Sequence, residues 1–212
     1  MIASAELQPF PHAEQIMAMP AAHRHRWTMA EVDRLIDARE GFTPRYELVD
    51  GELLVTPAPV KRHQRIILRL AFVLQPYLTG EGLGEILLGP GELKLVSGQH
   101  FEPDLFVDPA VGGRLPAADA PSDRPLLVCE VLSPSSSRHD RITKRRAFQR
   151  AGVPEYWIVD GDTEAFEIWH PSDERPALID DRVVWLPEGA GVPFELDVPA
   201  FFAAVADDAP LP

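Results

Sequence analysis

Cysteine is almost absent from this sequence of 212 residues, in which Cys129 stands alone. A lone cysteine excludes an internal disulfide, and its position inside an apolar stretch favours a small core hydrophobe over a nucleophile. Apolar stretches long enough for a membrane-spanning helix, which needs about 20 residues, are also lacking. The N-terminus has no basic region followed by an apolar segment, as a signal peptide would have. We therefore expect a cytoplasmic protein with no membrane partner.

Sequence motifs for nucleotide phosphates are missing as well. The chain has no Gly-x-Gly-x-x-Gly sequence and no Walker-type loop, which argues against nucleotide-binding folds. The serine-rich segment 133–137 has no Gly-x-Ser-x-Gly elbow, so we interpret it as a turn and helix cap. The hydrophobic fraction of 45% and the charged fraction of 25% are ordinary for a soluble globular protein with one core.

Basic residues are scarce toward the C-terminus. Residues 151–212 carry 2 basic and 14 acidic groups, whereas residues 1–150 carry 18 basic and 19 acidic groups. The net charge of −13 therefore does not exclude nucleic acid as a partner of the first part. Half of the basic residues fall in two segments, one with Lys61, Arg62, Arg65 and Arg69, the other with Arg138, Arg141, Lys144, Arg145, Arg146 and Arg150. Both are open to two interpretations, a solvated helix face or a surface that follows phosphates.

The chain divides into three parts by composition. Residues 1–22 contain three prolines and no sustained period, which predicts an N-terminal arm. Residues 23–170 carry the clearly periodic segments and form the predicted domain. Residues 171–212 are acidic and poorly periodic, and we expect an extension that packs on this domain or trails it.

Helices and strands alternate through the predicted domain. Thr28 and Glu31 form a capping-box pattern before a first helix, and Asp50-Gly51 between two apolar runs predicts a hairpin. The other predicted elements are a helix through Ile66, Leu70, Val73, Leu74 and Tyr77, strands at Glu85–Leu88, Leu93–Val96, Leu105–Val107 and Leu126–Leu132, a helix approximately from Asp140 to Arg150, and strands at Glu155–Val159 and Glu164–Trp169. This order predicts an α/β domain with a mixed central sheet flanked by helices.

One carboxylate interrupts an apolar strand. Glu130 is the charged residue within Leu126–Leu132, a run that is typical of a central strand covered on both faces. An unpaired carboxylate in such surroundings costs several kcal/mol, roughly, unless a cation or hydrogen bonds compensate it. A metal ion held by Glu130 and a second acid, with Lys144 nearby, would meet this requirement.

Lys144 falls on the apolar side of the predicted third helix, together with Asp140, Ala147 and Phe148. In one interpretation, its stem covers core while the ammonium reaches solvent or pairs with Asp140 at i−4. In the other, the ammonium points at a buried acidic site, where it orients a water nucleophile or neutralises a pentacovalent phosphorane. The buried position predicted for Glu130 favours the second interpretation.

Two further acids are candidates for the same site. A Pro-Asp pair such as Pro103-Asp104 is by itself more typical of a turn, but Asp104 gains weight as the acid upstream of Glu130. Two carboxylates from neighbouring strands suit Mg²⁺, which favours oxygen ligands and keeps several waters, one of which can become a nucleophile. Glu47 is either a third acid or an exposed hairpin residue.

His63 begins the second helix beside Lys61 and Arg62. Three interpretations stay open for its side chain, a phosphate contact, a proton shuttle or a structural residue.

These residues together resemble a known family. The similar stretches are Arg45 to Leu53, His63 with Ile66 and Leu70, Pro103 to Leu105, Cys129 to Ser135, and Gly152 to Asp160. They resemble the Uma-type family of restriction endonuclease-like proteins over approximately Thr28 to Trp169, and several motifs in the right order make the resemblance specific. That family is a branch of the PD-(D/E)XK nuclease superfamily, so the resemblance implies a restriction-endonuclease-like core in residues 23–170.

The resemblance also implies roles for individual residues. It implies Asp104 and Glu130 as the first and second metal acids, and Glu47 as the upstream acid found at such sites. The superfamily usually has its lysine two residues after the second acid, where Leu132 stands in this chain. In this family the lysine stands on the following helix, which matches Lys144.

Phe148 departs from the family pattern, which commonly has tyrosine four residues after the lysine. The missing hydroxyl is expected to weaken substrate contact without removing the metal site. Phe148 and the acidic balance favour a rival hypothesis, a nuclease-fold protein that binds nucleic acid or a protein partner without cleaving it.

We expect a Mg²⁺-dependent endonuclease, with Mn²⁺ as a substitute ion, that acts on DNA as a homodimer. The dimer follows from the resemblance and from the value of paired sites in cutting two strands. Contacts to nucleic acid are expected from Lys61, Arg62, His63, Arg141 and Arg145. Removing the charge of Asp104 or of Glu130 should relieve like-charge repulsion and leave the metal-free fold intact or stabilised.

Overall fold

The computed structural model describes residues 25–95 and 99–206. The predicted arm at residues 1–22 lies outside the described residues. The helical segments are α2 (Met29–Ala38), α3 (Lys61–Glu81), the π-helix η2 (His139–Lys144), α4 (Arg145–Ala151) and α5 (Val198–Val205). The strands are β1 (Arg45–Val49), β2 (Glu52–Thr56), β3 (Gly84–Leu88), β4 (Leu93–Leu95), β5 (Gln99–Phe101), β6 (Leu105–Pro109), β7 (Leu127–Val131), β8 (Tyr156–Asp160), β9 (Ala165–Trp169), β10 (Ala177–Ile179), β11 (Arg182–Trp185) and β12 (Phe194–Asp197). None of the described helices combines the length and apolar character needed to cross a membrane.

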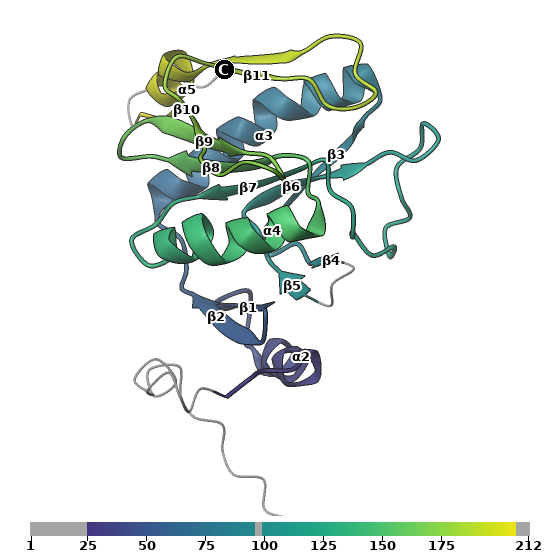
Figure 1. The fold of residues 1–212 in the computed structure, drawn as a ribbon, viewed down its shortest axis with the longest axis vertical. Coiled ribbons are helices and arrows are strands. Elements are labelled where there is room, and N and C mark those ends of the chain that lie inside the picture. Colours follow the sequence, from purple (N-terminus) through teal and green to yellow (C-terminus); the bar gives the residue numbers. More distant parts are fainter. Residues whose placement is uncertain (1–24, 96–98, 207–212) are drawn as a thin grey trace, which may run out of the picture.

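Six strands form the central sheet, in the order β10-β9-β8-β7-β6-β3. Strands β7 and β8 run parallel, and the other neighbouring pairs are antiparallel. A parallel pair needs a long crossover, and η2 with α4 provides it between β7 and β8 (Figure 1). The mixed central sheet flanked by helices is therefore confirmed.

Helices α3 and α5 cover one face of the central sheet, together with the hairpin of β11 and β12 (Figure 1). Helix α3 buries Ile66, Leu70, Leu74 and Leu78. The predicted face is confirmed at Ile66, Leu70 and Leu74, whereas Val73 is 39% exposed. The C-terminal elements add Val183, Trp185, Phe194, Leu196, Val198, Phe201, Phe202 and Val205 to the same core. The poorly periodic C-terminal segment thus contains regular elements that pack on the domain.

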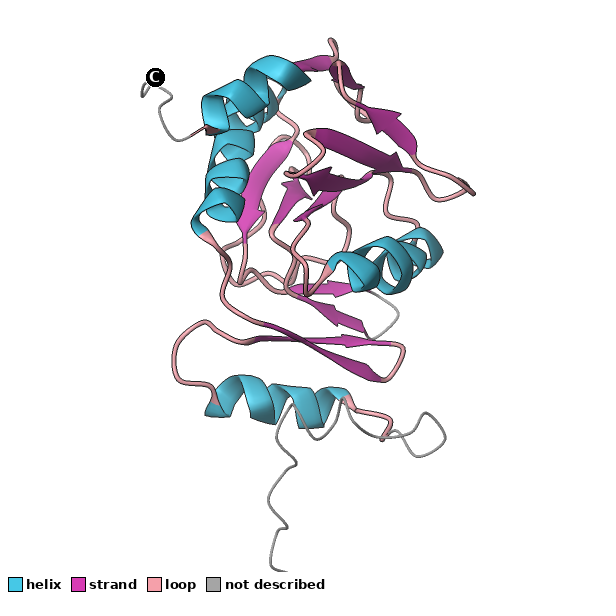
Figure 2. Ribbon diagram, turned by 90° about the vertical axis from the view of Figure 1, so that its left-hand side faces the viewer, coloured by secondary structure: helices cyan, strands magenta, loops and turns pink. Residues whose placement is uncertain are grey.

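The other face of the central sheet is covered by η2 and α4 and by a second, four-stranded sheet in the order β2-β1-β5-β4 (Figure 2). Phe148 of α4 packs between Phe101 of β5 and Tyr156 of β8, with ring centroids 4.5 and 4.9 Å apart. Helix α2 lies on the outer side of the small sheet and buries Val32 against Trp27 and Leu48. The inner face of the small sheet is therefore buried against α4 and the central sheet, in one core that includes Phe101, Phe148 and Tyr156.

The hairpin of β1 and β2 turns at Asp50-Gly51, as predicted. Both residues have positive φ, 52° and 79°, which is the backbone of a type I′ turn and explains the preference for Asp-Gly. The turn fixes the register of β1, whose side chains alternate between two environments. Tyr46 and Leu48 face α2, while Val49 belongs to the core shared with the central sheet. By the same alternation Glu47 is directed inward.

The third helix differs from the prediction at its start. Residues 139–144 form a π-helix before the α-helical turns of α4. Spacing in the sequence cannot separate these two forms over six residues, since both place residues four apart near one another. Short π segments are rare and often occur at functional sites.

Candidate functional site

The two acids predicted as metal ligands face each other across β6 and β7. Leu105 pairs with Cys129 in the antiparallel register, so Asp104, just before β6, lies opposite Glu130. Leu105 and Cys129 belong to the core under α3, and alternation directs Asp104 and Glu130 to the opposite side, toward α4 and the small sheet. The Asp104 N–H donates to Glu130 Oε2 at 3.4 Å.

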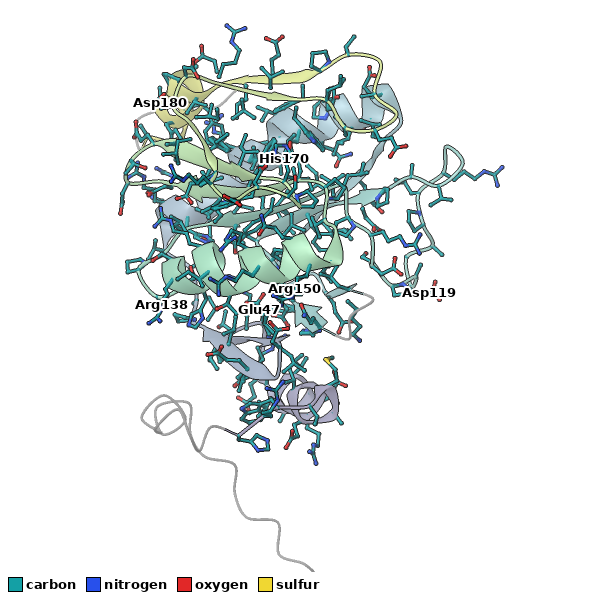
Figure 3. The ribbon with its side chains drawn as sticks, viewed as in Figure 1. Glu47, Asp119, Arg138, Arg150, His170 and Asp180 are labelled. Carbon is teal, nitrogen blue, oxygen red and sulfur yellow. The ribbon has the colours of Figure 1, made fainter. Side chains whose placement is uncertain are left out.

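Lys144, the last residue of η2, reaches the same acids. Its Nζ lies 2.7 Å from Glu47 Oε2, 2.8 Å from Glu130 Oε1 and 3.4 Å from Asp140 Oδ1. All four side chains are buried, and Glu47 enters from the small sheet below α4 (Figure 3). Lys144 thus pairs with Asp140 at i−4 and also points at the buried acid Glu130. The two interpretations of Lys144, a helix ion pair and an ammonium at an acidic site, do not exclude each other.

Asp104 is held by a separate set of donors. Arg45 Nη1 donates to Oδ1 at 2.7 Å, and the Val131 N–H donates to Oδ2 at 2.8 Å. His63 Nε2 lies 3.0 Å from the same Oδ2. His63 and Asp104 are 6% and 4% exposed, so this arrangement is buried as well.

Glu102 joins the two halves of the site. Its backbone N–H donates to Glu47 Oε1 at 3.0 Å, and its carbonyl accepts from Arg45 Nη1 at 2.9 Å. Its own carboxylate pairs with Arg39 at 3.2 Å. The segment between β5 and β6 therefore fixes Glu47 and Arg45 at the same time.

The two acids differ in their electrostatic environment. Burial opposes ionisation of Asp104, but the hydrogen bond from His63 and the charge of Arg45 outweigh it and hold the pKa of Asp104 below its usual value. Burial raises the pKa of Glu130 well above its usual value, because Lys144 offsets it only in part and the charges of Asp104, Asp140 and Glu47 add to it. Asp104 is therefore an ionised acid, whereas Glu130 resists ionisation.

Lys144 and Asp140 respond to the same cluster. Burial would lower the pKa of Lys144, but the charges of Glu130, Glu47 and Asp140 outweigh it and raise the pKa well above the usual value. Burial raises the pKa of Asp140, against the charge of Lys144. The Lys144 side chain is therefore an ammonium in the centre of a ring of acids.

The carboxylates have the chemistry of ligands for a hard divalent cation. Among the described residues, however, no group of three or more His, Cys, Asp or Glu side chains is arranged to hold a metal ion. Asp104 and Glu130 are adjacent, whereas Glu47 meets Glu130 through the Lys144 ammonium. The set thus fits an ion held by two carboxylates and water more readily than one held by three.

A groove of about 730 Å³ opens beside the two side chains that bind Asp104. Arg45 and His63 line it, as do segments 56–60, 131–137 and 160–162. Two further predicted contacts to nucleic acid, Arg62 and Arg141, line it as well. Arg62 pairs with Glu164 at 3.1 Å, and Arg141 Nη2 pairs with Asp160 at 3.2 Å.

The remaining predicted contacts lie elsewhere. Lys61 is exposed at the start of α3 and is not among the residues that line the groove. The Arg145 guanidinium lies over the Trp169 ring, 4.6 Å from its centroid. The structure therefore brings Arg62, His63 and Arg141 to one groove and leaves Lys61 and Arg145 outside it.

Phe148 does not contact the groove. It is fully buried in the aromatic packing of α4 against both sheets. The structure shows a packing role for Phe148, and the expected effect of the missing hydroxyl on substrate contact stays a prediction.

Sequence reasoning gave no role to Arg45 and treated Asp140 only as a partner of Lys144. A signal for Arg45 exists in the spacing, since Arg45 and Glu47 stand two residues apart and therefore share one face of β1. A basic and an acidic residue on the buried face of one strand would have indicated a role for Arg45.

Comparisons with known proteins identify the family and the fold of the chain. A family model named Uma2, described as “Putative restriction endonuclease”, matches residues 29–206. The chain belongs to the Uma2 family. The match continues through the C-terminal elements to the end of α5. Restriction endonucleases are phosphodiester hydrolases, so the family description agrees with the predicted enzyme class.

Two relatives show how far the likeness extends. The uncharacterized protein slr1290 of Synechocystis sp. is 27% identical over 140 residues, which cover 64% of this chain and 70% of that protein. A crystal structure from Anabaena variabilis, described as a “putative nuclease belonging to DUF820”, aligns with a TM-score of 0.65 at 20% identity. The alignment covers 82% of this chain and 98% of that one. The Uma2 chain thus shares the fold of that protein, in agreement with the predicted α/β core.

Proposed function

We propose that this Uma2-family protein is a Mg²⁺-dependent endonuclease that hydrolyses phosphodiester bonds of DNA. One observation supports the proposal, a surplus of buried carboxyl groups over buried fixed cations. The carboxylates of Glu47, Asp104, Glu130 and Asp140 are each at most 4% exposed. Among the described residues, their permanently charged partners are Lys144 and Arg45, with His63 beside Asp104. Four carboxyl groups against two fixed cations leave Glu130 and Asp140 with raised pKa values, and a divalent ion would offset the buried charge of their ionised forms.

Asp104 and Glu130 are the residues that would hold the ion. They offer carboxylate oxygens from facing strands, and Mg²⁺ is commonly bound by one or two carboxylates while it keeps several waters. Glu47, the third acid of the prediction, completes the acidic set from β1 through its contact with Lys144. Bound there, Mg²⁺, or Mn²⁺ in its place, would lower the pKa of a coordinated water and polarise a phosphoryl oxygen.

Lys144 supplies fixed positive charge at the same place. Three carboxylates hold its ammonium in a buried position, so it needs no reorganisation when charge develops on a phosphoryl oxygen. The groove lined by Arg62, His63 and Arg141 would receive the strand beside it. In a homodimer two such sites would act on the two strands of duplex DNA.

Incubation of the purified protein with supercoiled plasmid, single-stranded DNA and RNA, each with Mg²⁺, Mn²⁺ or EDTA, tests this proposal. We expect nicked or linear plasmid with either metal and none with EDTA. Glu130→Gln should abolish cleavage, while Lys94→Met, which removes an exposed lysine paired with Glu92, should retain it. DNA binding without cleavage under every metal condition would overturn the endonuclease and favour a nuclease-fold protein that binds nucleic acid.

A further inference from the structure

Arg45 is an almost buried arginine in the wall of the groove. Its side chain is 10% exposed, and it lines the groove together with His63 and Ser133. The two hydrogen bonds that the structure gives to its guanidinium both use Nη1, one to Asp104 Oδ1 and one to the Glu102 carbonyl. A guanidinium carries five N–H donors in a rigid fork. Neither Asp104 nor the Glu102 carbonyl therefore uses the N–H groups on Nε and Nη2.

His63 offers a second polar atom at the same place. Its Nε2 contacts Asp104, and its Nδ1 is buried without a hydrogen-bond partner among the described residues. Buried polar atoms nearly always have a partner in folded proteins. Because His63 is a groove-lining residue, a ligand or a water that enters beside it would be the partner of this nitrogen.

The start of α3 adds backbone donors to this corner of the groove. The N-cap residue of this 21-residue helix is Val60, which has no side-chain oxygen to accept from the first turn. Val60, Arg62 and His63 all line the groove. The positive end of a long helix, with its first N–H groups uncapped by a side chain, favours an anion.

The groove also has acidic residues, Asp160 and Asp162, in its lining. Asp160 is already satisfied by the chain, since it pairs with Arg141 and its Oδ1 accepts the N–H groups of Asp162 and Thr163 at 2.9 and 3.2 Å. The corner formed by Arg45, His63 and the start of α3 therefore carries the unused donors, and we name it the Arg45 corner.

We propose that the Arg45 corner binds a phosphate group of a nucleic-acid strand, and that Arg45 contacts that phosphate through Nε and Nη2. The inference rests on the proposed function in that the ligand is the phosphodiester backbone of the substrate. Donors from a guanidinium plane and from a helix start reach the ligand from different directions, which suits a tetrahedral anion better than a planar carboxylate. Because Arg45 also binds Asp104, the phosphate lies beside the acidic site.

Binding measured without metal tests this site apart from catalysis. The probe is a fluorescein-labelled single-stranded DNA of 12 nucleotides, followed by anisotropy in low-salt buffer with EDTA. Arg45→Gln should weaken binding by about tenfold or more, in the range of a charge-assisted bidentate contact. Arg45→Lys should not restore it, because lysine keeps the charge without the fork. Arg182→Gln removes an exposed arginine paired with Glu195 and should change binding by less than about twofold.

A second pair of variants leaves the buried contacts intact. Ser135 is exposed and lines the same groove. Ser135→Asp should weaken binding several-fold relative to the neutral Ser135→Asn, because the added charge repels a phosphate. Inorganic phosphate should displace the DNA more effectively than chloride at equal ionic strength, which distinguishes a phosphate site from general screening.

Wild-type affinity in a folded Arg45→Gln protein would overturn the inference. If Arg45→Gln does not fold, equal affinities of Ser135→Asp and Ser135→Asn would overturn it instead, as would the absence of DNA binding by the wild type. A protein that binds through Arg45 but never cleaves with metal would keep this inference and lose the proposed function. Metal-dependent cleavage together with unaltered binding by Arg45→Gln would keep the proposed function and overturn this inference.

Discussion

Asp104 and Glu130 face each other across two antiparallel strands, yet the fold stabilises opposite protonation states of the two acids. The Asp104 N–H donates to Glu130 Oε2 at 3.4 Å. Arg45 and His63 contact Asp104 and lower its pKa, whereas burial among other acids raises the pKa of Glu130. The same charge-removing substitution should therefore have opposite effects at the two positions.

Asp104→Asn should destabilise the metal-free protein. The like-charge argument predicted an unchanged or higher stability, but Arg45 and His63 reverse the expected sign because they would lose a buried partner. Breaking one side of a buried ion pair costs about 3–5 kcal/mol. Since the pKa of Asp104 is lowered in the folded state, its contribution is present above the unfolded value and is lost as pH falls through the folded value. Thermal melts in EDTA should show a clear loss of Tm at pH 7 that narrows toward pH 3.

Glu130→Gln should leave the metal-free protein as stable as the wild type or more stable at pH 8. The raised pKa of Glu130 means that its favourable contribution is present below the unfolded value and is lost as pH rises through the folded value. Lys144 keeps Glu47 and Asp140 as partners in this variant. Melts of Asp104→Asn and Glu130→Gln that shift in the same direction at pH 8 would contradict the assigned environments.

Lys144→Met should remove most of the cleavage activity while it leaves metal ligands in place. A preorganised donor at a developing charge is typically worth about 10²–10³ in rate. The variant also leaves three buried carboxylates without their ammonium, so its Tm should fall more at pH 8 than at pH 5. Single-turnover cleavage and Mn²⁺ titration by calorimetry separate the two effects, and Lys94→Met controls for the loss of a lysine. Full activity in Lys144→Met would exclude the lysine from the reaction.

The central part of this arrangement was predictable from the sequence. A glutamate inside an apolar strand, and a lysine on the apolar side of the next helix, both follow from periodicity. The pairing of Asp104 with Arg45 could not be predicted. Arg45 lies in the small sheet and Asp104 precedes a strand of the central sheet, so their contact depends on how the hairpin of β1 and β2 packs against β6. Arg45 and Glu47 are two residues apart and therefore share one face of β1, but the sequence does not show which residues that face contacts.

The C-terminal elements were missed for a different reason. In β11, exposed Val184 stands between buried Val183 and buried Trp185, so the alternation of apolar and polar residues disappears. Strand β12 does alternate, from Phe194 to Asp197, but it is only four residues long. Such short strands become stable through packing on α3 and the central sheet, and a local pattern does not contain that information.

The salt dependence of DNA binding should depend on the basic residues of the groove. Arg62 and Arg141 line it, whereas Arg175 and Arg182 are exposed and outside it. The double variant Arg62→Gln, Arg141→Gln should flatten the plot of log Kd against log salt by about one unit per lost phosphate contact. The double variant Arg175→Gln, Arg182→Gln serves as the matched control with the same loss of charge. Equal slopes for the two double variants would show that the strand does not run along this groove.

A pH effect on stability should arise outside the site, at Glu155. Its carboxylate lies 3.0 Å from His170 Nε2 and is 9% exposed. Burial, which His170 offsets in part and Asp173 reinforces, raises the pKa of Glu155 to about 7. A carboxyl with a raised folded pKa stabilises the protein below its unfolded value of 4.5, and that contribution is lost as pH rises to about 7.

Glu155→Gln should therefore melt higher than the wild type at pH 8, by about 2–4 °C for each kcal/mol recovered in a chain of this length. At pH 4.5 the two proteins should melt close together, because Glu155 is then protonated in the folded wild type and resembles glutamine. Glu195→Gln removes an exposed carboxylate paired with Arg182 and should show no comparable change between the two pH values. A Tm difference between Glu155→Gln and wild type that stays constant from pH 4.5 to 8 would mean that the pKa of Glu155 is the same in the folded and unfolded states, and that His170 compensates its burial completely.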